Sequence, residues 1–251
     1  MAELKMKKTA SGFWADKQDK TIFTDSCIVI PSQYMGEPVI GVCEGAFAEA
    51  EWLEKVVIED GIQKIERFAF CMCKNLKEVH LPESITEIGG GAFEGCGRLR
   101  SIVIPDNVKV LESDTFSLCS HLRYVALPRS IQKIECGAFE MAGTDYAPAK
   151  TVQIKPGRSK AIADEEKIND KKNYGIMIWI PKSNFSEFLG EFSRYAVLYF
   201  EGNEEDAAKE WSKYDNKPLK MFEHRIDKSE MPQIYRYNVT KEEFLDICKS
   251  L

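Results

Sequence analysis

The sequence predicts an α/β solenoid, with a ladder of short parallel strands on one side and short helical turns on the other. The main observation is an internal repeat, since one dipeptide position recurs five times at a constant step of 23 residues. The five copies are Ala46-Phe47, Ala69-Phe70, Ala92-Phe93, Thr115-Phe116 and Ala138-Phe139. Between these copies, apolar residues keep the same register. A repeat of this length cannot bury its apolar face alone, so the copies are expected to stack.

Each repeat contains a V-x-I phrase, such as Val56 with Ile58, which predicts a short strand with both apolar residues on one face. Proline follows in three copies and ends the strand, because it has no backbone donor. These prolines are Pro82, Pro105 and Pro128. The A-F-x-x-C-x-x-L segment has near-helical spacing and predicts one short helical turn. Stacking at the ~4.8 Å strand spacing would join equivalent side chains into internal ladders.

The repeat formula I-x-x-I-x-x-x-A-F-x-x-C-x-x-L-x-x-V-x-I-P resembles leucine-rich repeats of the BspA type. The stretch from Ile30 to Val42 resembles the strand, glycine turn and second strand that begin such arrays. The resemblance covers about residues 28 to 155. It implies a leucine-rich-repeat solenoid, in a family whose members are mostly surface or secreted binding proteins.

Four segments follow from this pattern. Residues 1–27, with Phe13-Trp14 and Ile22-Phe23, are expected to form an N-terminal cap, and residues 28–156 the repeats. After Ala142 the rhythm is interrupted, and Thr151–Ile154 is expected to supply the next strand. Residues 157–173 are polar and predict a loop or linker. Residues 174–251 are expected to be diverged repeats ending in a helical cap, or alternatively a separate small α+β domain.

The last segment combines strand phrases with helical stripes. The strand phrases are Ile176–Pro181, Ala196–Phe200, Leu219–Phe222 and Ile234–Tyr237. Amphipathic stripes at 185–192 and 207–214 predict helices, and Glu204-Glu205-Asp206 suits the start of the second. Thr240 and Glu243 form a capping box that predicts a final helix.

Eight cysteines raise the question of metal or disulfide chemistry. Cys73, Cys96 and Cys119 share one repeat position, so their side chains should point the same way, which is poor disulfide geometry. Paired C-x-x-C elements or spaced histidines, typical of zinc sites, are missing from the sequence. The favoured interpretation is a column of small buried thiols, which fits a reducing compartment.

No nucleophile, zinc-protease or phosphate-loop motif occurs in the sequence, so we expect no enzyme activity, no cofactor and no metal. The net charge of −6 argues against nucleic acid as the main partner. No apolar run approaches the ~20 residues of a membrane span. If Met1 is the natural start, the cytoplasm is expected; a trimmed leader would instead indicate the cell surface or secretion. The oligomeric state stays open.

The expected partner is another protein, bound by the outward side chains of the ladder. If Val56 and Ile58 point inward, two outward columns follow. They are Lys55, Glu78, Ser101, Tyr124 and Thr151, and Val57, His80, Val103, Ala126 and Gln153. The valines and alanine make this face more apolar than is usual for a sheet face exposed to solvent. Tyr124 and His80 would be polar anchors on it. Trp52 is a further candidate anchor.

Two other interpretations remain. The outward face could be covered by the C-terminal part of the chain, or be ordinary solvated sheet. An alternative function is carbohydrate or small-ligand binding by an aromatic-rich C-terminal region, which needs these aromatics to be exposed. The aromatics concerned are Trp179, Tyr195, Tyr199, Trp211, Tyr235 and Tyr237.

Overall fold

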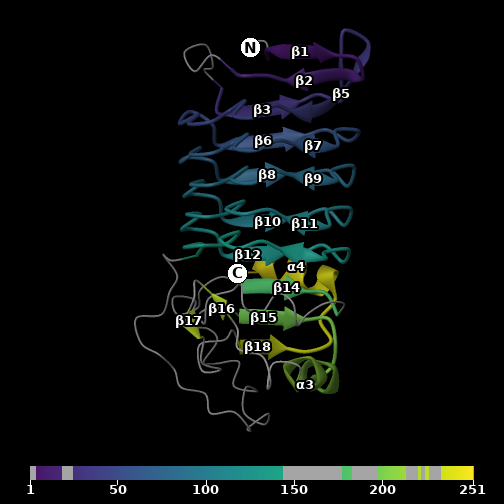
Figure 1. Cartoon of the computed structure of the whole chain (residues 1–251), viewed down its shortest axis with the longest axis vertical. Coiled ribbons are helices and arrows are strands. Elements are labelled where there is room, and N and C mark those ends of the chain that lie inside the picture. Colours follow the sequence, from purple (N-terminus) through teal and green to yellow (C-terminus); the bar gives the residue numbers. More distant parts are fainter. Residues whose placement is uncertain are drawn as a thin grey trace.

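The structure is a computed structural model that describes residues 4–18, 25–143, 177–182, 197–212, 220–221, 224–225 and 233–250. The coils stack along the long axis of the molecule, and each regular coil adds one strand to each of two columns (Figure 1). The first column begins with β3 (Cys27–Ile30), β6 (Lys55–Ile58), β8 (Glu78–His80), β10 (Ser101–Val103) and β12 (Tyr124–Ala126). The second contains β5 (Glu37–Val42), β7 (Lys64–Ile65), β9 (Glu87–Ile88), β11 (Val110–Leu111) and β13 (Lys133–Ile134).

The paired strands of each column run parallel in the register of the repeat, and the hydrogen-bonded sheets are interrupted between β8 and β10 and between β9 and β11. Lys55 pairs with Glu78 in the first column, and Lys64 pairs with Glu87 in the second. The predicted parallel ladder is therefore confirmed as a β-solenoid. The second column was not predicted, because strands of two residues are too short to show a period of two.

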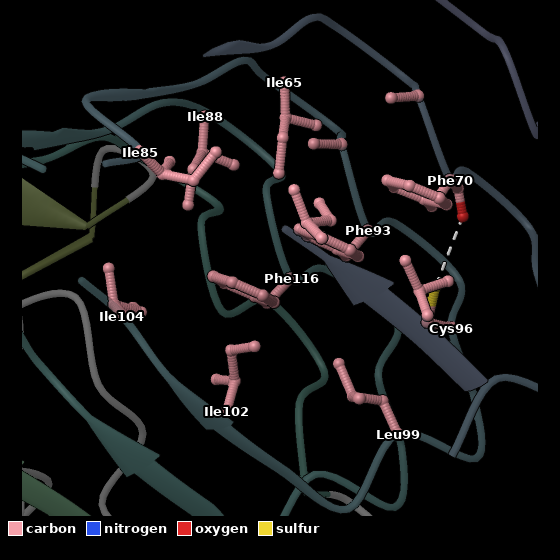
Figure 2. Close-up of a cluster of buried hydrophobic side chains, with 14 of the residues drawn as sticks. Ile65, Phe70, Ile85, Ile88, Phe93, Cys96, Leu99, Ile102, Ile104 and Phe116 are labelled. Atoms are coloured by element: carbon pink, nitrogen blue, oxygen red, sulfur yellow. Dashed lines mark hydrogen bonds between the residues drawn. The ribbon is translucent and has the colours of Figure 1, made fainter. Parts of the chain in front are cut away.

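The core consists of apolar side chains at equivalent repeat positions, stacked from coil to coil (Figure 2). Phe47 and Phe70 lie with ring centroids 5.2 Å apart and an interplanar angle of 6°. The same stacking continues through Phe93 and Phe116 to Phe139. The ring stack runs parallel to the strands' hydrogen-bonding direction, so each coil buries the aromatic of its neighbour.

The cysteine column lies beside the phenylalanines as free thiols. The Sγ of Cys73 donates a hydrogen bond to the carbonyl of Phe47 at 3.0 Å, and that of Cys96 to Phe70 at 3.2 Å. Burial raises the pKa of Cys119 to about 12. The thiols therefore pack as small neutral groups, as the sequence predicted, and their high pKa disfavours the reactive thiolate.

The A-F-x-x-C-x-x-L segments form successive turns, and the predicted helical turn is wrong. Two positions of each copy adopt left-handed backbone, as at Gly45 (φ 62°) and Glu49 (φ 59°). A right-handed helix cannot include such residues, so the segment bends twice instead. At Gly91 (φ 64°) a Cβ would lie 2.4 Å from the Phe68 ring, which shows why glycine stands there.

The N-terminal end of the ladder carries an antiparallel hairpin of β1 (Met6–Thr9) and β2 (Gly12–Ala15). Strand β2 also pairs in parallel with β5, and Phe13 is buried against the core. A second hairpin joins β4 (Gln33–Tyr34) to β5. Ile22-Phe23, expected in the cap, lies outside the described residues.

The first column continues through three C-terminal strands. They are β14 (Met177–Ile180), β15 (Val197–Phe200) and β18 (Gln233–Arg236), and β12 pairs directly with β14. Thr151–Ile154 therefore does not supply the strand next to β12; its own structure lies outside the described residues. These three strands extend the first column in parallel, and the assignment of residues 174–251 as diverged repeats stays a prediction.

Other C-terminal elements lie outside the ladder. Strands β16 (Lys220–Met221) and β17 (His224–Arg225) pair antiparallel with each other, so the third strand phrase does not extend the solenoid. Helix α3 (Glu204–Ser212) follows β15, and α4 (Lys241–Ser250) follows β18. The stripe at 185–192 lies outside the described residues. Helix α4 lies against a face of the sheet, and a helical cap over the ladder's end stays a prediction.

Candidate functional site

Outward side chains of the first column lie on one side of the stack, which consists of a three-stranded sheet (β3, β6, β8) followed by a five-stranded sheet (β10, β12, β14, β15, β18). In β6, Val56 is buried whereas Lys55 and Val57 point outward, as the alternation of a strand requires. From β3 to β10 these outward residues are partly or fully exposed to solvent. We call this part the open face, and it comprises Val29, Lys55, Val57, Glu78, His80, Ser101 and Val103.

The continuation of the same face, from β12 to β15, is covered by α4. Ala126 and Trp179 are buried there, and Tyr124 is half-buried. We call this part the covered face, and it comprises Tyr124, Ala126, Met177, Trp179 and Tyr199. Ala126 is therefore no partner-binding residue, because the chain's own helix occupies it. Thr151 and Gln153 are likewise not the neighbours of β12, since Met177 and Trp179 hold those positions.

Helix α4 is held by its capping box and its apolar side. The Thr240 hydroxyl accepts a hydrogen bond from Glu243 N–H, and the Glu243 carboxylate accepts one from Thr240 N–H at 2.8 Å. Phe244 is fully buried and packs on Tyr199, with ring centroids 5.1 Å apart. The Trp179 indole N–H donates to the carbonyl of Val239 at 2.8 Å, so the largest buried side chain also has its polar atom satisfied.

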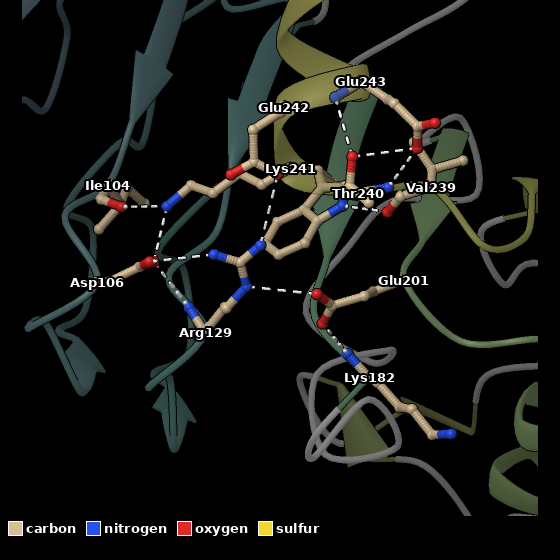
Figure 3. Close-up of polar contacts among 11 residues, drawn as sticks. Ile104, Asp106, Arg129, Lys182, Glu201, Val239, Thr240, Lys241, Glu242 and Glu243 are labelled. Carbon is tan, nitrogen blue, oxygen red and sulfur yellow. Dashed lines mark hydrogen bonds and ion pairs between the residues drawn. The ribbon is translucent and has the colours of Figure 1, made fainter.

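A group of charged residues fixes the start of α4 to the ladder (Figure 3). The buried Lys241 ammonium donates to Asp106 Oδ1 at 2.7 Å and lies 3.4 Å from the carbonyl oxygen of Ile104. Arg129 contacts Asp106, Glu201 Oε1 at 3.3 Å and Glu242 Oε2 at 3.7 Å. Both cations also lie over the Trp179 ring. Positively and negatively charged side chains therefore alternate within this group. We call the group the clamp, because it joins the start of α4 to the ladder.

Ionisation of Asp106 follows from this clamp. Burial opposes the charged form, but hydrogen bonds from Lys241 and from the Arg129 backbone outweigh burial and lower the pKa of Asp106 below its ordinary value. The carboxylate is thus ionised when α4 is in place. Sequence reasoning missed this clamp because its members are far apart in the chain and share no motif.

The open face carries one cross-strand ion pair. Lys55 Nζ lies 2.8 Å from Glu78 Oε2, and the hydrogen bond raises the pKa of Lys55 and lowers that of Glu78. Both side chains are exposed, so the pair is worth little to stability. Around it, Val29, Val57 and Val103 present apolar surface. The sequence did not indicate Val29, because its coil is longer and breaks the 23-residue step.

Trp52 lies apart from the open face. It is half-buried against the core and lines a shallow depression of about 460 Å³ with Glu49, Glu51, Met72 and Lys74. None of the open-face residues lines this depression. Trp52 is therefore not part of the open face, and its role as a further candidate anchor stays a prediction.

The aromatic-rich region does not meet the requirement of a carbohydrate site at its described residues. Trp179 and Tyr199 are buried beneath α4, and Tyr237 is exposed. The side chains of Tyr195, Trp211 and Tyr235 lie outside the described residues. Within the part of the chain that the structure describes, no cluster of His, Cys, Asp or Glu could hold a metal ion. No helix among those residues is long and apolar enough to cross a membrane.

The geometry defines a leucine-rich repeat solenoid, and comparison with known proteins agrees. Residues 41–149 match the family described as BspA type leucine rich repeat region, in six copies. This part of the chain therefore matches the BspA-type leucine-rich repeat family, which the sequence resemblance also indicated. No curated protein sequence matches the chain.

Solved structures of bacterial leucine-rich repeat proteins are similar to the chain. The T. pallidum leucine-rich repeat protein is 31% identical with a TM-score of 0.52, over 56% of this chain and 65% of that one. A leucine-rich cell surface protein from Faecalibacterium prausnitzii is 28% identical with a TM-score of 0.50, over 54% and 35%. The pneumococcal vaccine antigen PcpA shares the fold at 17% identity and a TM-score of 0.54, over 91% and 47%. The chain thus spans less than two thirds of each of these proteins.

Proposed function

We propose that the chain is a non-catalytic protein-interaction module whose open face binds another protein. The observation that carries the proposal is that Val29 and Val103 are exposed and Val57 is half-buried on strands β3, β10 and β6 of one column, on a face whose continuation already binds a helix. Apolar side chains placed together on an exposed face are typical of interaction sites. Proteins with leucine-rich repeats commonly present such surfaces, which supports the same conclusion.

A photo-crosslinking experiment tests this function. The same coil offers a matched pair of exposed valines, Val103 in β10 (38% exposed) and Val110 in β11 (36% exposed), on different columns. A benzophenone amino acid is placed at one or the other position, and the protein is irradiated in a native lysate. We expect a discrete crosslinked protein from position 103 alone. Equal crosslinking from both positions, or none from 103, would contradict an interaction site on the open face.

Tyr124 was predicted as an anchor for the partner, but it belongs to the covered face. Tyr124 packs against the cluster beneath α4, so its substitution would disturb the helix as well as any partner. His80 is exposed in the middle of the open face, between Val57 and Val103 in the stack. His80→Ala is therefore the variant that tests a polar anchor, and we expect it to weaken capture of the crosslinked protein.

A further inference from the structure

Two arginines, Arg98 and Arg100, border the open face at the N-terminal end of β10. Arg100 immediately precedes β10, and its backbone lies between those of Lys77 and Arg123 in the neighbouring coils. The Arg100 N–H points to the Lys77 carbonyl at 3.5 Å, and the Arg123 N–H donates to the Arg100 carbonyl at 2.8 Å. Arg98 is exposed two residues earlier in the same coil. Arg98 and Arg100 thus bring two positive charges of one coil to this edge of the face.

The charge at this edge is not balanced along the stack. In the preceding coils, Lys77 pairs with Glu54 at 2.9 Å and Lys74 with Glu51 at 3.7 Å. Arg98 and Arg100 are exposed and form no salt bridge within the described residues. Glu78 feels the charge of Arg100 but is already bound by Lys55. A net positive edge in a chain of net charge −6 favours contact with carboxylates.

Helix α4 shows which kind of segment this sheet face accepts. Its apolar side packs on the covered face through Phe244, with Leu245, Ile247 and Cys248 partly buried beside it. Within ten residues it also carries three carboxylates, Glu242, Glu243 and Asp246. Glu242 reaches Arg129, which follows β12 and so lies at the C-terminal ends of the parallel strands, the end opposite Arg98 and Arg100. An amphipathic helix with acidic residues is therefore already bound to the continuation of the open face.

We propose that the open face binds an acidic amphipathic helix of a partner protein, alongside α4. Its apolar residues pack on Val57, Val103 and Val29, and its carboxylates contact Arg98 and Arg100 at the edge. This inference rests on the proposed function and specifies the partner's chemistry. It follows the general mode in which an amphipathic helix lays its apolar face on an apolar surface, with charges fixing its orientation.

Fluorescence anisotropy with two stapled peptides tests the proposal. One carries the sequence of residues 239–250 with Cys248→Ser, and the other has lysine in place of Glu242, Glu243 and Asp246. We expect the acidic peptide to bind roughly tenfold more tightly at low salt, and the preference to shrink as salt rises. The double variant R98E/R100E should abolish the preference. Lys109→Glu, an exposed cation of the same coil at the other column, should leave it unchanged.

Substitutions of exposed valines test whether the apolar surface of the open face is needed for peptide binding. Val103→Asp should abolish binding of both peptides, whereas Val110→Asp should not. The proposal is overturned if both peptides bind equally, or if Lys109→Glu acts like R98E/R100E. It is also overturned if a 20-mer RNA binds through the arginines independently of Val103, or if Val103→Asp only dissolves a homodimer seen by sedimentation. Crosslinking at position 103 without peptide discrimination would refute the acidic partner but leave the proposed function standing.

Discussion

The open face and the covered face lie on the same side of the first column and differ in what they contact. The open face is exposed to solvent, whereas the covered face packs against α4. Val103 and Trp179 occupy the same outward column, and Ala126 of β12 stands between them. Val103 is exposed to solvent, whereas Ala126 and Trp179 are buried under α4. The repeat therefore determines which side chains point outward from the core. Helix α4, which lies outside the repeat, determines whether these side chains are exposed to solvent. The following predictions test this distinction, from the largest effect to the smallest.

Truncation of Trp179 should give the largest difference in stability between substitutions on the covered face and on the open face. Trp179→Ala removes a fully buried indole and its hydrogen bond to Val239, so we expect a loss of about 3–5 kcal/mol in the free energy of unfolding. Val103→Ala, in the same outward column, should cost within about 0.5 kcal/mol. Urea unfolding followed by circular dichroism measures both. Similar losses for the two variants would mean that the two faces do not differ in burial.

The clamp at the start of α4 gives the next effect. Lys241→Ala should destabilise the protein by about 1–3 kcal/mol, because it leaves Asp106 without its principal hydrogen-bond donor in a partly buried place. The double variant K241M/D106N should recover part of the loss, since it removes both charges. Amide hydrogen exchange should show faster exchange in α4 of the single variant, with the coils from β6 to β10 unchanged. Uniform acceleration would contradict a local clamp.

Acid should loosen the clamp first. The pKa of Asp106 is lowered in the folded chain, so its stabilising contribution is complete above its unfolded value near 3.8 and is lost as pH falls through the folded value. The contribution is below about 1 kcal/mol, because the carboxylate is partly exposed and solvent screens the pair. Asp106→Asn should reduce the change in stability between pH 5 and the acid limit, measured by urea unfolding at each pH. An unchanged profile in this variant would assign the acid sensitivity to other carboxylates.

The ion pair of the open face should give the smallest effect. A double-mutant cycle of Lys55→Ala and Glu78→Ala is expected to yield a coupling close to zero, because both side chains are exposed and solvent screens the pair. The corresponding cycle for Lys241 and Asp106 should give a larger coupling, since the ammonium is buried. Reversal of this order would remove the electrostatic difference between the open face and the clamp.

The stacking and the strand alternation, which arise within the repeat, could be predicted from the sequence, whereas features that depend on α4 could not. Identical spacing of Phe47, Phe70 and Phe93 was enough to predict the ladder, because each coil repeats the contacts of its neighbour. The outward positions of Lys55 and Val57 followed from strand alternation. The burial of Ala126 did not, because it depends on a contact with Phe244, more than 100 residues later and outside the repeat. The left-handed turn positions were also hidden, since Glu49 stands where Gly95 stands in another coil.

The 23-residue register determines how the length of the open face can change. Strands of the first column pair only with their immediate neighbours, as β6 does with β3 and β8. Duplication or deletion of one whole coil between β6 and β10 would therefore recreate the same junctions. Each event would lengthen or shorten the open face by one strand spacing, ~4.8 Å, and leave the attachment of α4 untouched. The reach of the surface can thus vary in discrete steps while its anchored end stays constant.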